Sequence, residues 1–433
     1  FRICSSSHIS WKQKLRRSWG RLDMKSEWKT YTVQELIDLG MLEAPMDGNH
    51  GNLHPKVSDY VLEGIPFIMA NDLVNGKVDY KKCAHITEAQ ARQLKKGFAH
   101  PGDVLLTHKA TIGRTALVGN EYDTIVLTPQ ITYYRVKKGI SNRYLKAYFD
   151  SKEFQELLSN WAGSGSTRAY LGITAQRKLP ILLPSIDIQN KIASYCESID
   201  GKITVNSMIN DNLEQQAVAL FKSWFVDFSL FGGTVPENWE DTTLENITTL
   251  ITRGIAPKYS DNSDQTVVNQ KCIRNHTIDL SLARTHTPKT INEKWLKFGD
   301  LLINSTGDGT LGRVAQVWFV PKALTVDSHV TIVRPAREEL IFYIGLWGIL
   351  HEKEIESLHT GSTGQTELPR DRVKMLKLLL PDDSSLSRFN SIIAPMASTI
   401  ISNQEENQKL ASLRDTLLPK LMSGEIDVSS IQL

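Results

Sequence analysis

The chain has 433 residues, 41% of them hydrophobic and 23% charged, which is typical of globular protein and predicts two or three domains. Its 50 basic and 48 acidic residues nearly balance, so a polyanionic partner would have to meet a locally basic surface. The sequence contains no run of about 18 apolar residues, so no membrane-spanning helix is predicted. The four cysteines lie far apart and form no C-x-x-C pair, so we expect neither a zinc knuckle nor a disulfide framework, as in a cytoplasmic protein.

Residues 1–23 differ from the rest of the chain. They contain six basic residues and one acidic residue, without strand alternation or a long apolar run. We interpret them as an N-terminal extension. An Arg- and Ser-rich targeting peptide and a DNA-contacting tail are the alternatives. A domain-like sequence begins at Met24 with MKSEWKTYTVQELIDLG.

Residues 24–184 read as one mixed α/β module. Residues 98–118, FAHPGDVLLTHKATIGRTALV, contain Gly-Asp, an apolar strand, a polar loop, Gly-Arg and a second apolar strand. A further strand-like run at 124–136 precedes a helical pattern at 141–162. After Leu182-Leu183-Pro184 the sequence becomes polar and helical, so the module is predicted to end there.

The same order of motifs recurs at 233–381. Gly299-Asp300 repeats Gly102-Asp103 at an offset of 197 residues, and Gly312-Arg313 repeats Gly113-Arg114 at 199. Gly-Ser-Thr and Leu-Leu-Pro recur at offsets of 196 and 197. The openings at 26–40 and 237–251 also resemble each other, as do the strand-like run at 323–335 and the helical pattern at 339–359. The chain is therefore predicted to be a tandem duplication.

The glycines of the second copy, in FGDLLINSTGDGTLGRVAQV at 298–317, first suggest a phosphate-binding loop. No Lys-Ser/Thr follows Gly312, and the loop of the first copy keeps only one glycine. A phosphate cradle needs several backbone N–H groups that point inward, so a nucleotide site is not expected. The chain also lacks the Asn/Asp-Pro-Pro-aromatic motif of amino-methyltransferases, so we predict no enzyme activity in it.

Each module is followed by a long helical pattern, at 186–229 and at 383–423. Every seventh residue is mostly apolar, which predicts a coiled-coil seam, with a helix lying on a globular core as the alternative. The seam positions are Ile192, Ile199, Asn206, Leu213 and Leu220, and Phe389, Met396, Asn403, Leu410 and Leu417. Pro395 is expected to kink or restart the second helix, and Pro419 to bend or end its last turn.

Four seam asparagines stand out: Asn206 and Asn210 in the first helix, and Asn403 and Asn407 in the second. A buried Asn is tolerated where a partner Asn satisfies it, and it then fixes the register. An antiparallel pairing would bring the two pairs of asparagines together.

The order of these motifs, their duplication and the ending LLPKLMSGEI at 417–426 resemble the specificity (S) subunit of type I restriction–modification systems, over residues 24–433. The resemblance implies an α+β fold, in which two similar mixed α/β target-recognition domains are joined by two long helices that form an antiparallel coiled coil with pseudo-twofold symmetry. The implied domains are an N-terminal extension (1–23), recognition domain 1 (24–184), a central spacer helix and linker (185–232), recognition domain 2 (233–381) and a C-terminal spacer helix (382–433).

The resemblance also implies a function. Each recognition domain reads one half of a bipartite double-stranded DNA target, and the helices set the spacing and dock two methyltransferase subunits. Those subunits bind S-adenosylmethionine, and two restriction (motor) subunits use ATP and Mg²⁺, whereas this chain holds no cofactor or metal and is not catalytic. The alternatives are the specificity region of a fused restriction–modification enzyme and a coiled-coil adaptor that binds only protein.

Base reading requires polar side chains on loops that reach the groove edges, while phosphate contacts set the position. In the first module the predicted DNA-binding residues are Asn49, His50, Asn71, Lys109, Arg114, Ser164, Ser166, Thr167 and Arg168. In the second they are Arg253, Lys258, Tyr259, Lys271, Arg274, Asn275, Asn304, Ser305, Thr310, Arg313, Ser362, Thr363 and Gln365. Solvated surface loops are the alternative for any one of them, and Arg114 and Arg313 fit phosphate contacts and structural ion pairs equally well.

Overall fold

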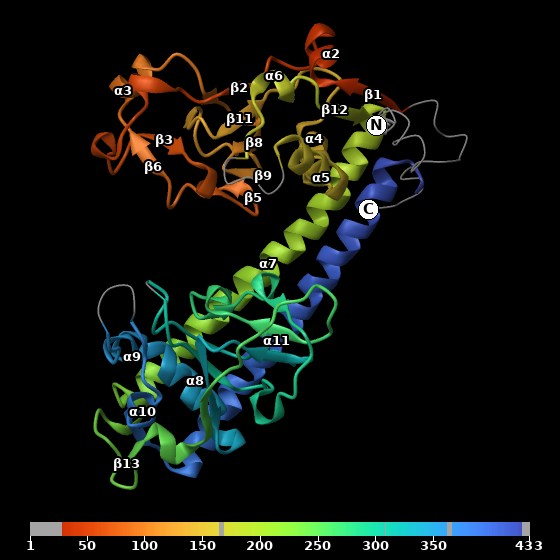
Figure 1. Ribbon diagram of the computed structural model, residues 1–433. Helices are drawn as coiled ribbons and strands as arrows, with labels where there is room; N and C mark the ends of the chain where they lie inside the picture. Colours follow the sequence, from red (N-terminus) through yellow and green to blue (C-terminus); the bar gives the residue numbers. More distant parts are fainter. Residues whose placement is uncertain (1–27, 164–168, 308, 362–365, 427–433) are drawn as a thin grey trace, which may run out of the picture. The chain divides into compact units, whose positions relative to one another are not determined.

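The computed structural model describes residues 28–163, 169–307, 309–361 and 366–426 (Figure 1). The chain divides into two compact units, one made of the residues up to Ile203 together with those from Lys409 onwards, and one made of Thr204–Gln408. Each unit contains one of the two predicted modules and a segment of each long helix. None of the helices in the described ranges is long and apolar enough to cross a membrane. The predicted extension at 1–23 lies outside the described residues.

The first module is closed by its own ends. Strand β1 pairs antiparallel with β12, so that Lys29 faces Leu183 and the opening of the module meets its Leu-Leu-Pro end. Two further sheets have the strand orders β2-β11-β8-β9-β5-β4 and β6-β3-β10-β7. The strands are Lys29–Thr32 (β1), Met46–Asp47 (β2), Ile65–Ile68 (β3), Leu73–Val74 (β4), Gly76–Val78 (β5), Ala84–Ile86 (β6), Phe98–Ala99 (β7), Val104–Lys109 (β8), Thr111–Leu117 (β9), Ile125–Leu127 (β10), Ile131–Tyr134 (β11) and Pro180–Leu183 (β12). The helices are Val33–Asp38 (α2), Glu88–Gln93 (α3), Asn142–Asp150 (α4), Lys152–Trp161 (α5) and Ile173–Gln176 (α6).

The second module closes in the same way, because β13 pairs antiparallel with β23. Its other sheets have the orders β14-β22-β19-β20, β18-β15-β21 and β16-β17. The strands are Glu240–Thr243 (β13), Thr248–Arg253 (β14), Thr266–Val268 (β15), Ile273–Arg274 (β16), Thr277–Ile278 (β17), Arg284–Thr285 (β18), Leu301–Asn304 (β19), Val314–Gln316 (β20), Leu324–Val326 (β21), Val330–Pro335 (β22) and Lys377–Leu380 (β23). The helices are Ile341–Leu350 (α8), Glu352–Ser357 (α9) and Arg370–Lys374 (α10).

The predicted duplication is visible in the pairing of the central hairpins. Leu105 faces Ala116 across β8 and β9, and Leu302 faces Ala315 across β19 and β20. The first hairpin turns tightly at Ala110, which adopts φ 65°, whereas a longer loop joins the second pair of strands. Two additional residues in that loop account for the change of offset from 197 to 199.

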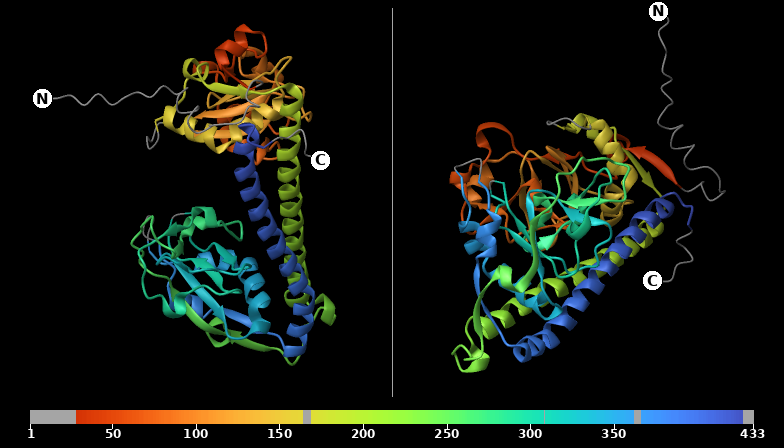
Figure 2. Two further views of the ribbon diagram at one scale, coloured as in Figure 1. Left: turned by 90° about the vertical axis from the view of Figure 1, so that its right-hand side faces the viewer. Right: turned by 60° about the horizontal axis from the view of Figure 1, so that its bottom comes forward.

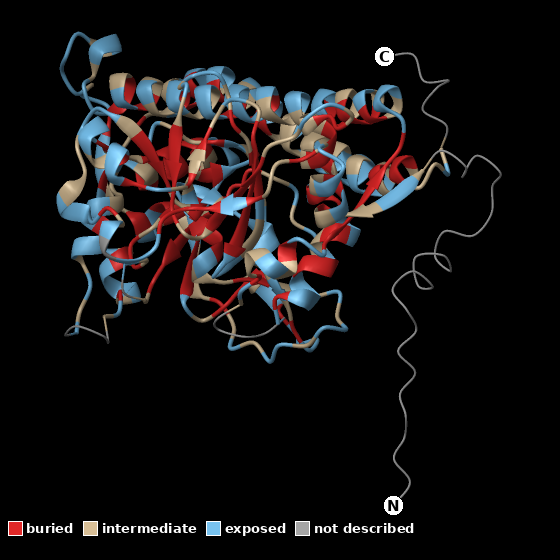
Figure 3. Ribbon diagram, turned by 90° about the horizontal axis from the view of Figure 1, so that it is seen from above, coloured by how far each residue is buried: buried red, intermediate tan, exposed pale blue. Residues whose placement is uncertain are grey.

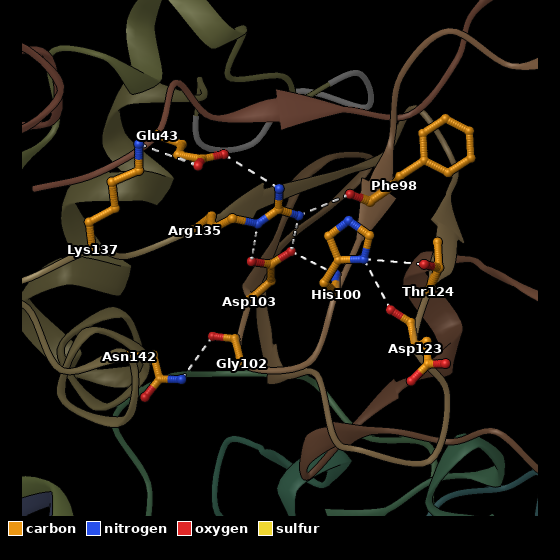
Figure 4. Close-up of polar contacts among 10 residues, drawn as sticks. All are labelled: Glu43, Phe98, His100, Gly102, Asp103, Asp123, Thr124, Arg135, Lys137 and Asn142. Atoms are coloured by element: carbon orange, nitrogen blue, oxygen red, sulfur yellow. Dashed lines mark hydrogen bonds and ion pairs between the residues drawn. The ribbon is translucent and has the colours of Figure 1, made fainter. Parts of the chain in front are cut away.

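The Gly-Asp motif has a structural explanation, shown in Figure 4. The buried Asp103 carboxylate accepts hydrogen bonds from Arg135 at 2.9 and 2.7 Å and from the His100 backbone N–H at 2.8 Å. In the second module, Arg334 donates to Asp300 at 2.8 and 2.7 Å. A buried charge is costly unless it is paired and hydrogen-bonded, so this ion pair fixes the frame of each module from the inside.

Two long helices, Ile186–Phe225 (α7) and Asp383–Met422 (α11), complete the units. Helix α7 ends four residues before the predicted position 229, because Phe228 adopts a left-handed conformation and Ser229–Phe231 forms a 3₁₀ turn. Helix α11 runs through Pro395 as one helix, so the expected restart there was wrong. In Figure 3 the strands are mostly buried, whereas both helices alternate between buried and exposed residues, as expected for helices that bury one stripe.

Each unit buries helical residues in the core of its own module. Ile192 and Leu421 belong to the core of the first unit, and Phe221 and Phe389 to that of the second. The segments of α7 and α11 that belong to the second unit run side by side in both views of Figure 2. The helices therefore pair with each other and also lie on globular cores, so the two interpretations of the heptad pattern both hold.

Candidate nucleic-acid interface

The seam asparagines meet in the second unit, as the sequence predicted. The Asn206 side-chain amide donates to Asn407 at 2.9 Å, and that of Asn403 donates to Asn210 at 2.8 Å. Asn206 and Asn210 are buried. Since the partner of the earlier residue is the later one, this pairing is antiparallel. In the first unit, Arg414 forms an ion pair with Asp200 at 2.6 Å.

Four predicted contact residues of the first module are exposed: His50, Asn71, Lys109 and Arg114. Lys109 ends strand β8, and Asn71 lies in a 3₁₀ turn before β4. The Arg114 guanidinium donates to the backbone oxygen of Ala70 at 3.2 Å. Lys109 and Asn71 therefore lie at or beside strand ends, whereas Arg114 lies within β9.

A buried carboxylate orients a histidine and a lysine beside this surface. The Asp47 side chain is 7% exposed and binds His50 Nε2 at 2.7 Å and the Lys96 ammonium. Burial by itself would raise the pKa of Asp47, but the bonds with Lys96 and His50 outweigh it and hold this pKa below its ordinary value. Asp47 is therefore a charged acceptor that holds both donors in place.

His108 and Tyr170 form the neighbouring part of this surface. His108 is buried, and its Nδ1 lies 3.1 Å from the Leu171 carbonyl oxygen, which can only accept, so Nδ1 is the donor. Burial lowers the pKa of His108, and the neutral ring leaves Nε2 without a partner. The Tyr170 ring is 52% exposed and lies 5.7 Å from the His108 ring. The sequence analysis missed Tyr170 and Lys96; an aromatic residue close after the Gly-Ser-Thr motif was the available signal for Tyr170.

In the second module, Lys258, Tyr259, Lys271, Arg274 and Asn275 are exposed, as predicted for contact residues. The Arg284 guanidinium carbon lies 3.8 Å from the centre of the Tyr259 ring, in an exposed cation–π contact that the sequence analysis did not identify.

Asn275 and His276 both have positive φ, at 50° and 61°, as required at the two-residue turn that joins β16 and β17. Asn75 and Gly76 form the equivalent turn of the first module, between β4 and β5.

Three predicted contact residues are buried instead: Asn49, Asn304 and Ser305. The Asn304 amide donates to the Gln270 carbonyl at 3.0 Å, and the Ser305 hydroxyl lies 2.6 Å from that of Thr331. Asn304 is the last residue of β19 and Ser305 follows it, and both side chains point into the fold, where they are fully buried. The burial of all three residues contradicts the prediction of exposed loop residues, although the Asn49 amide nitrogen and the Asn304 amide oxygen have no hydrogen-bond partner among the described residues.

Arg253 and Thr310 have partners within the protein. Arg253 pairs with Glu367 at 2.7 Å and donates to the Leu368 carbonyl at 3.0 Å. The Thr310 hydroxyl is 3.2 Å from the Gly307 carbonyl oxygen, which closes the loop before β20. Arg313 is half-buried immediately before β20. The remaining predicted residues, Ser164, Ser166, Thr167, Arg168, Ser362, Thr363 and Gln365, lie outside the described residues.

A titratable cluster lies where α7 meets the second module. His276 Nε2 is 3.3 Å from a Glu352 carboxylate oxygen that also accepts the Val314 backbone N–H at 2.9 Å. Burial, reinforced by Asp211, raises the pKa of Glu214 on α7 to about 7, while the charge of His276 acts in the opposite direction. The bond with Glu352 raises the pKa of His276.

Comparison with known proteins shows what the chain is similar to. Residues 25–215 match the model of the type I restriction modification DNA specificity domain. The chain is 27% identical to the type I restriction enzyme MjaIX specificity subunit of Methanocaldococcus jannaschii, over 93% of this chain and 95% of that protein. It is 21% identical to the HindI specificity subunit of Haemophilus influenzae, over 93% of this chain and 100% of that protein. The crystal structure of a type I S subunit from M. genitalium shares the fold, with a TM-score of 0.50 and 14% identity, over 93% of this chain and 98% of that one.

Proposed function

We propose that the chain is a specificity subunit of a type I restriction–modification system and that each of its two modules reads one half of a bipartite DNA target. The observation that carries this proposal is the duplication itself. Two modules built on the same Asp–Arg ion pair and the same closing strand pair each have a core of their own. Two such readers on one chain suit a target with two parts.

The long helices would set the gap between the two halves and dock two methyltransferase subunits. Those partners would supply S-adenosylmethionine, and two restriction (motor) subunits would use ATP and Mg²⁺ for cleavage. The chain itself would contribute recognition without catalysis or a cofactor. The paired seam asparagines support the role of the helices as a spacer, because a buried Asn–Asn bond disfavours any sliding of one helix along the other. A cytoplasmic location remains a prediction.

A module exchange tests the proposal. Residues 24–184 are replaced by the module of another family member, and the DNA methylated by the complex is mapped. Because each wrong base pair costs about 1–3 kcal/mol and separated positions act almost independently, one half of the target should change while the other half and the gap persist. Lengthening α7 by one turn, about 5.4 Å, should change only the gap.

Two results would contradict the proposal. A module exchange that alters both halves at once would show that the modules do not read independently. A chain that binds its protein partners without sequence-specific DNA binding would instead be an adaptor.

A further inference from the structure

The two modules have the same backbone hydrogen bonds at one end of their central strands. In each, a strand-end residue donates its N–H to the turn before the next central strand and accepts an N–H from the segment that follows the Gly-Ser-Thr motif. The bonds are His108 to Gln130 and Leu171 to His108 in the first module, and Ser305 to His329 and Leu368 to Ser305 in the second, all between 2.8 and 2.9 Å.

The close approach of a neighbouring loop is also shared. A Cβ added at Gly48 would lie 1.9 Å from the Leu127 carbonyl oxygen, and one added at Gly254 would lie 1.9 Å from that of Val326. Only glycine fits at both places. The shared bonds and glycines match position with position without any sequence alignment: Asp47 corresponds to Arg253, His108 to Ser305, Lys109 to Thr306, and Tyr170 to Glu367.

The side chains at these matched positions have different chemistry. The first module has the buried Asp47 carboxylate, which holds His50 and Lys96, beside the exposed Tyr170 ring. The second module has a cation at the position of Asp47, since Arg253 pairs with Glu367, whose side chain is 56% exposed. On the same backbone frame, the acidic Asp47 of the first module corresponds to the basic Arg253 of the second. The aromatic Tyr170 likewise corresponds to the carboxylate of Glu367.

Unpaired polar atoms gather at the same places. In the first module they are the Asn49 amide nitrogen, His108 Nε2 and the hydroxyls of Thr128 and Thr132, all on buried residues. Thr132 lies directly opposite Asp47 in the sheet. In the second unit, where His286 and Asn390 also have unpaired atoms, they include Arg253 Nε at the position matched to Asp47 and the Asn304 amide oxygen at the strand end beside Ser305. Buried polar groups normally have partners, so donors and acceptors are still available there for a polar ligand.

We infer that the base-discriminating sites of the two modules lie at and beside these matched positions, made by His50, Lys109 and Tyr170 in the first module and by Arg253 and Glu367 in the second. The inference rests on the proposed function. A duplicated scaffold that reads two different half-sites needs a constant frame and different contact groups, and this combination is found here. Tyr170 offers a stacking face, Lys109 offers donors, and His50, whose Nε2–H donates to Asp47, offers its second ring nitrogen. Glu367 offers an acceptor for a base amino group, and Arg253 offers donors.

The test uses the full chain assembled with its methyltransferase subunits and a library of random DNA duplexes, whose bound fraction is sequenced. Tyr170→Ala should reduce the preference for the favoured base at one or more positions at least tenfold, only in the half that an exchange of residues 24–184 alters. Glu367→Gln should act only in the other half. Lys82→Ala, which removes a charge from an 83% exposed side chain of the first module outside the site, should leave every preference unchanged.

The outcomes are separable. If both variants melt like the wild type and retain its preferences at every position, the inference is wrong while the proposed function stands. If the wild-type complex itself enriches no sequence, the proposed function fails and the inference with it. Should Tyr170→Ala unfold the first module, the exposed Glu367→Gln still decides: loss of base preference in this variant supports the inference, and full retention of the preference overturns it.

Discussion

Glu214 should make the stability of the chain depend on pH in a predictable direction. Its pKa is raised from an ordinary 4.5 to about 7, first by burial and then by Asp211, while His276 opposes the shift. Because the folded chain holds this proton more tightly than the unfolded chain, stability is lost as the pH rises from about 4.5 to about 7 and remains lower above that. The full difference corresponds to roughly 3 kcal/mol, and screening of a side chain that is partly exposed reduces it to about 1–2 kcal/mol.

Glu214→Gln should remove most of this loss, because a neutral amide resembles the protonated carboxyl. The free energy of unfolding is measured at pH 5 and pH 8 by tryptophan fluorescence, which reports the core around Trp224 and Trp239. The variant should gain about 1–2 kcal/mol over the wild type at pH 8 and much less at pH 5. Glu405→Gln, an exposed substitution on α11, is the control. An equal difference at both pH values would refute the reasoning.

Three further predictions concern the scaffold. Replacing all four seam asparagines with leucine should raise the melting temperature but loosen the register or oligomeric state, which size-exclusion chromatography with light scattering would detect; a variant that stays monodisperse with an unchanged elution would argue against a register role. Asp300→Ala should destabilise the second unit by about 3–5 kcal/mol in chemical denaturation. Asp103→Ala should cost less, because its partner Arg135 has a side chain that is 26% exposed, whereas that of Arg334, the partner of Asp300, is 11% exposed. The reverse order would contradict this account. Gly312→Ala should lower the melting temperature more than Gly113→Ala, since the added Cβ would meet the Glu356 backbone at 2.6 Å in one case and a flexible Gln155 side chain in the other; equal losses would show that backbone strain dominates.

The duplication could be predicted from the sequence because its signals are local and occur twice. The Gly-Asp motif recurs where a buried carboxylate must pair with an arginine on a neighbouring strand. Leu-Leu-Pro recurs where each module closes on its opening strand. The pairing of the seam asparagines could be predicted because a side-chain amide in an apolar heptad seam is tolerated mainly where a partner amide satisfies it. In each case one residue type at one spacing has a narrow range of structural causes.

The candidate site could be predicted only in part, because reaching a ligand depends on contacts between distant segments. In the sequence, Asn304 and Ser305 resemble loop residues because further polar residues follow them. In the structure, hydrogen bonds with Gln270 and Thr331 hold their side chains inside the fold. Tyr170 looks like an ordinary aromatic residue, but its segment returns to the end of β8 and presents the ring to solvent. Polarity alone does not distinguish the two situations.

The modules separate the groups that hold the fold from those that are free to vary. The Asp–Arg ion pair, the strand-end hydrogen bonds and the glycine contacts are made within each module and use main-chain atoms or fully paired charges. Side chains such as Tyr170 and Glu367 project from this frame with about half of their surface exposed, so substituting them removes little buried area. Exposed substitutions away from such internal contacts usually change stability by less than about 0.5 kcal/mol. At an exposed side chain without an ion pair, such as Tyr170, a change of contact chemistry is therefore nearly neutral for folding, and under the proposed function this would let two copies of one scaffold come to read different sequences.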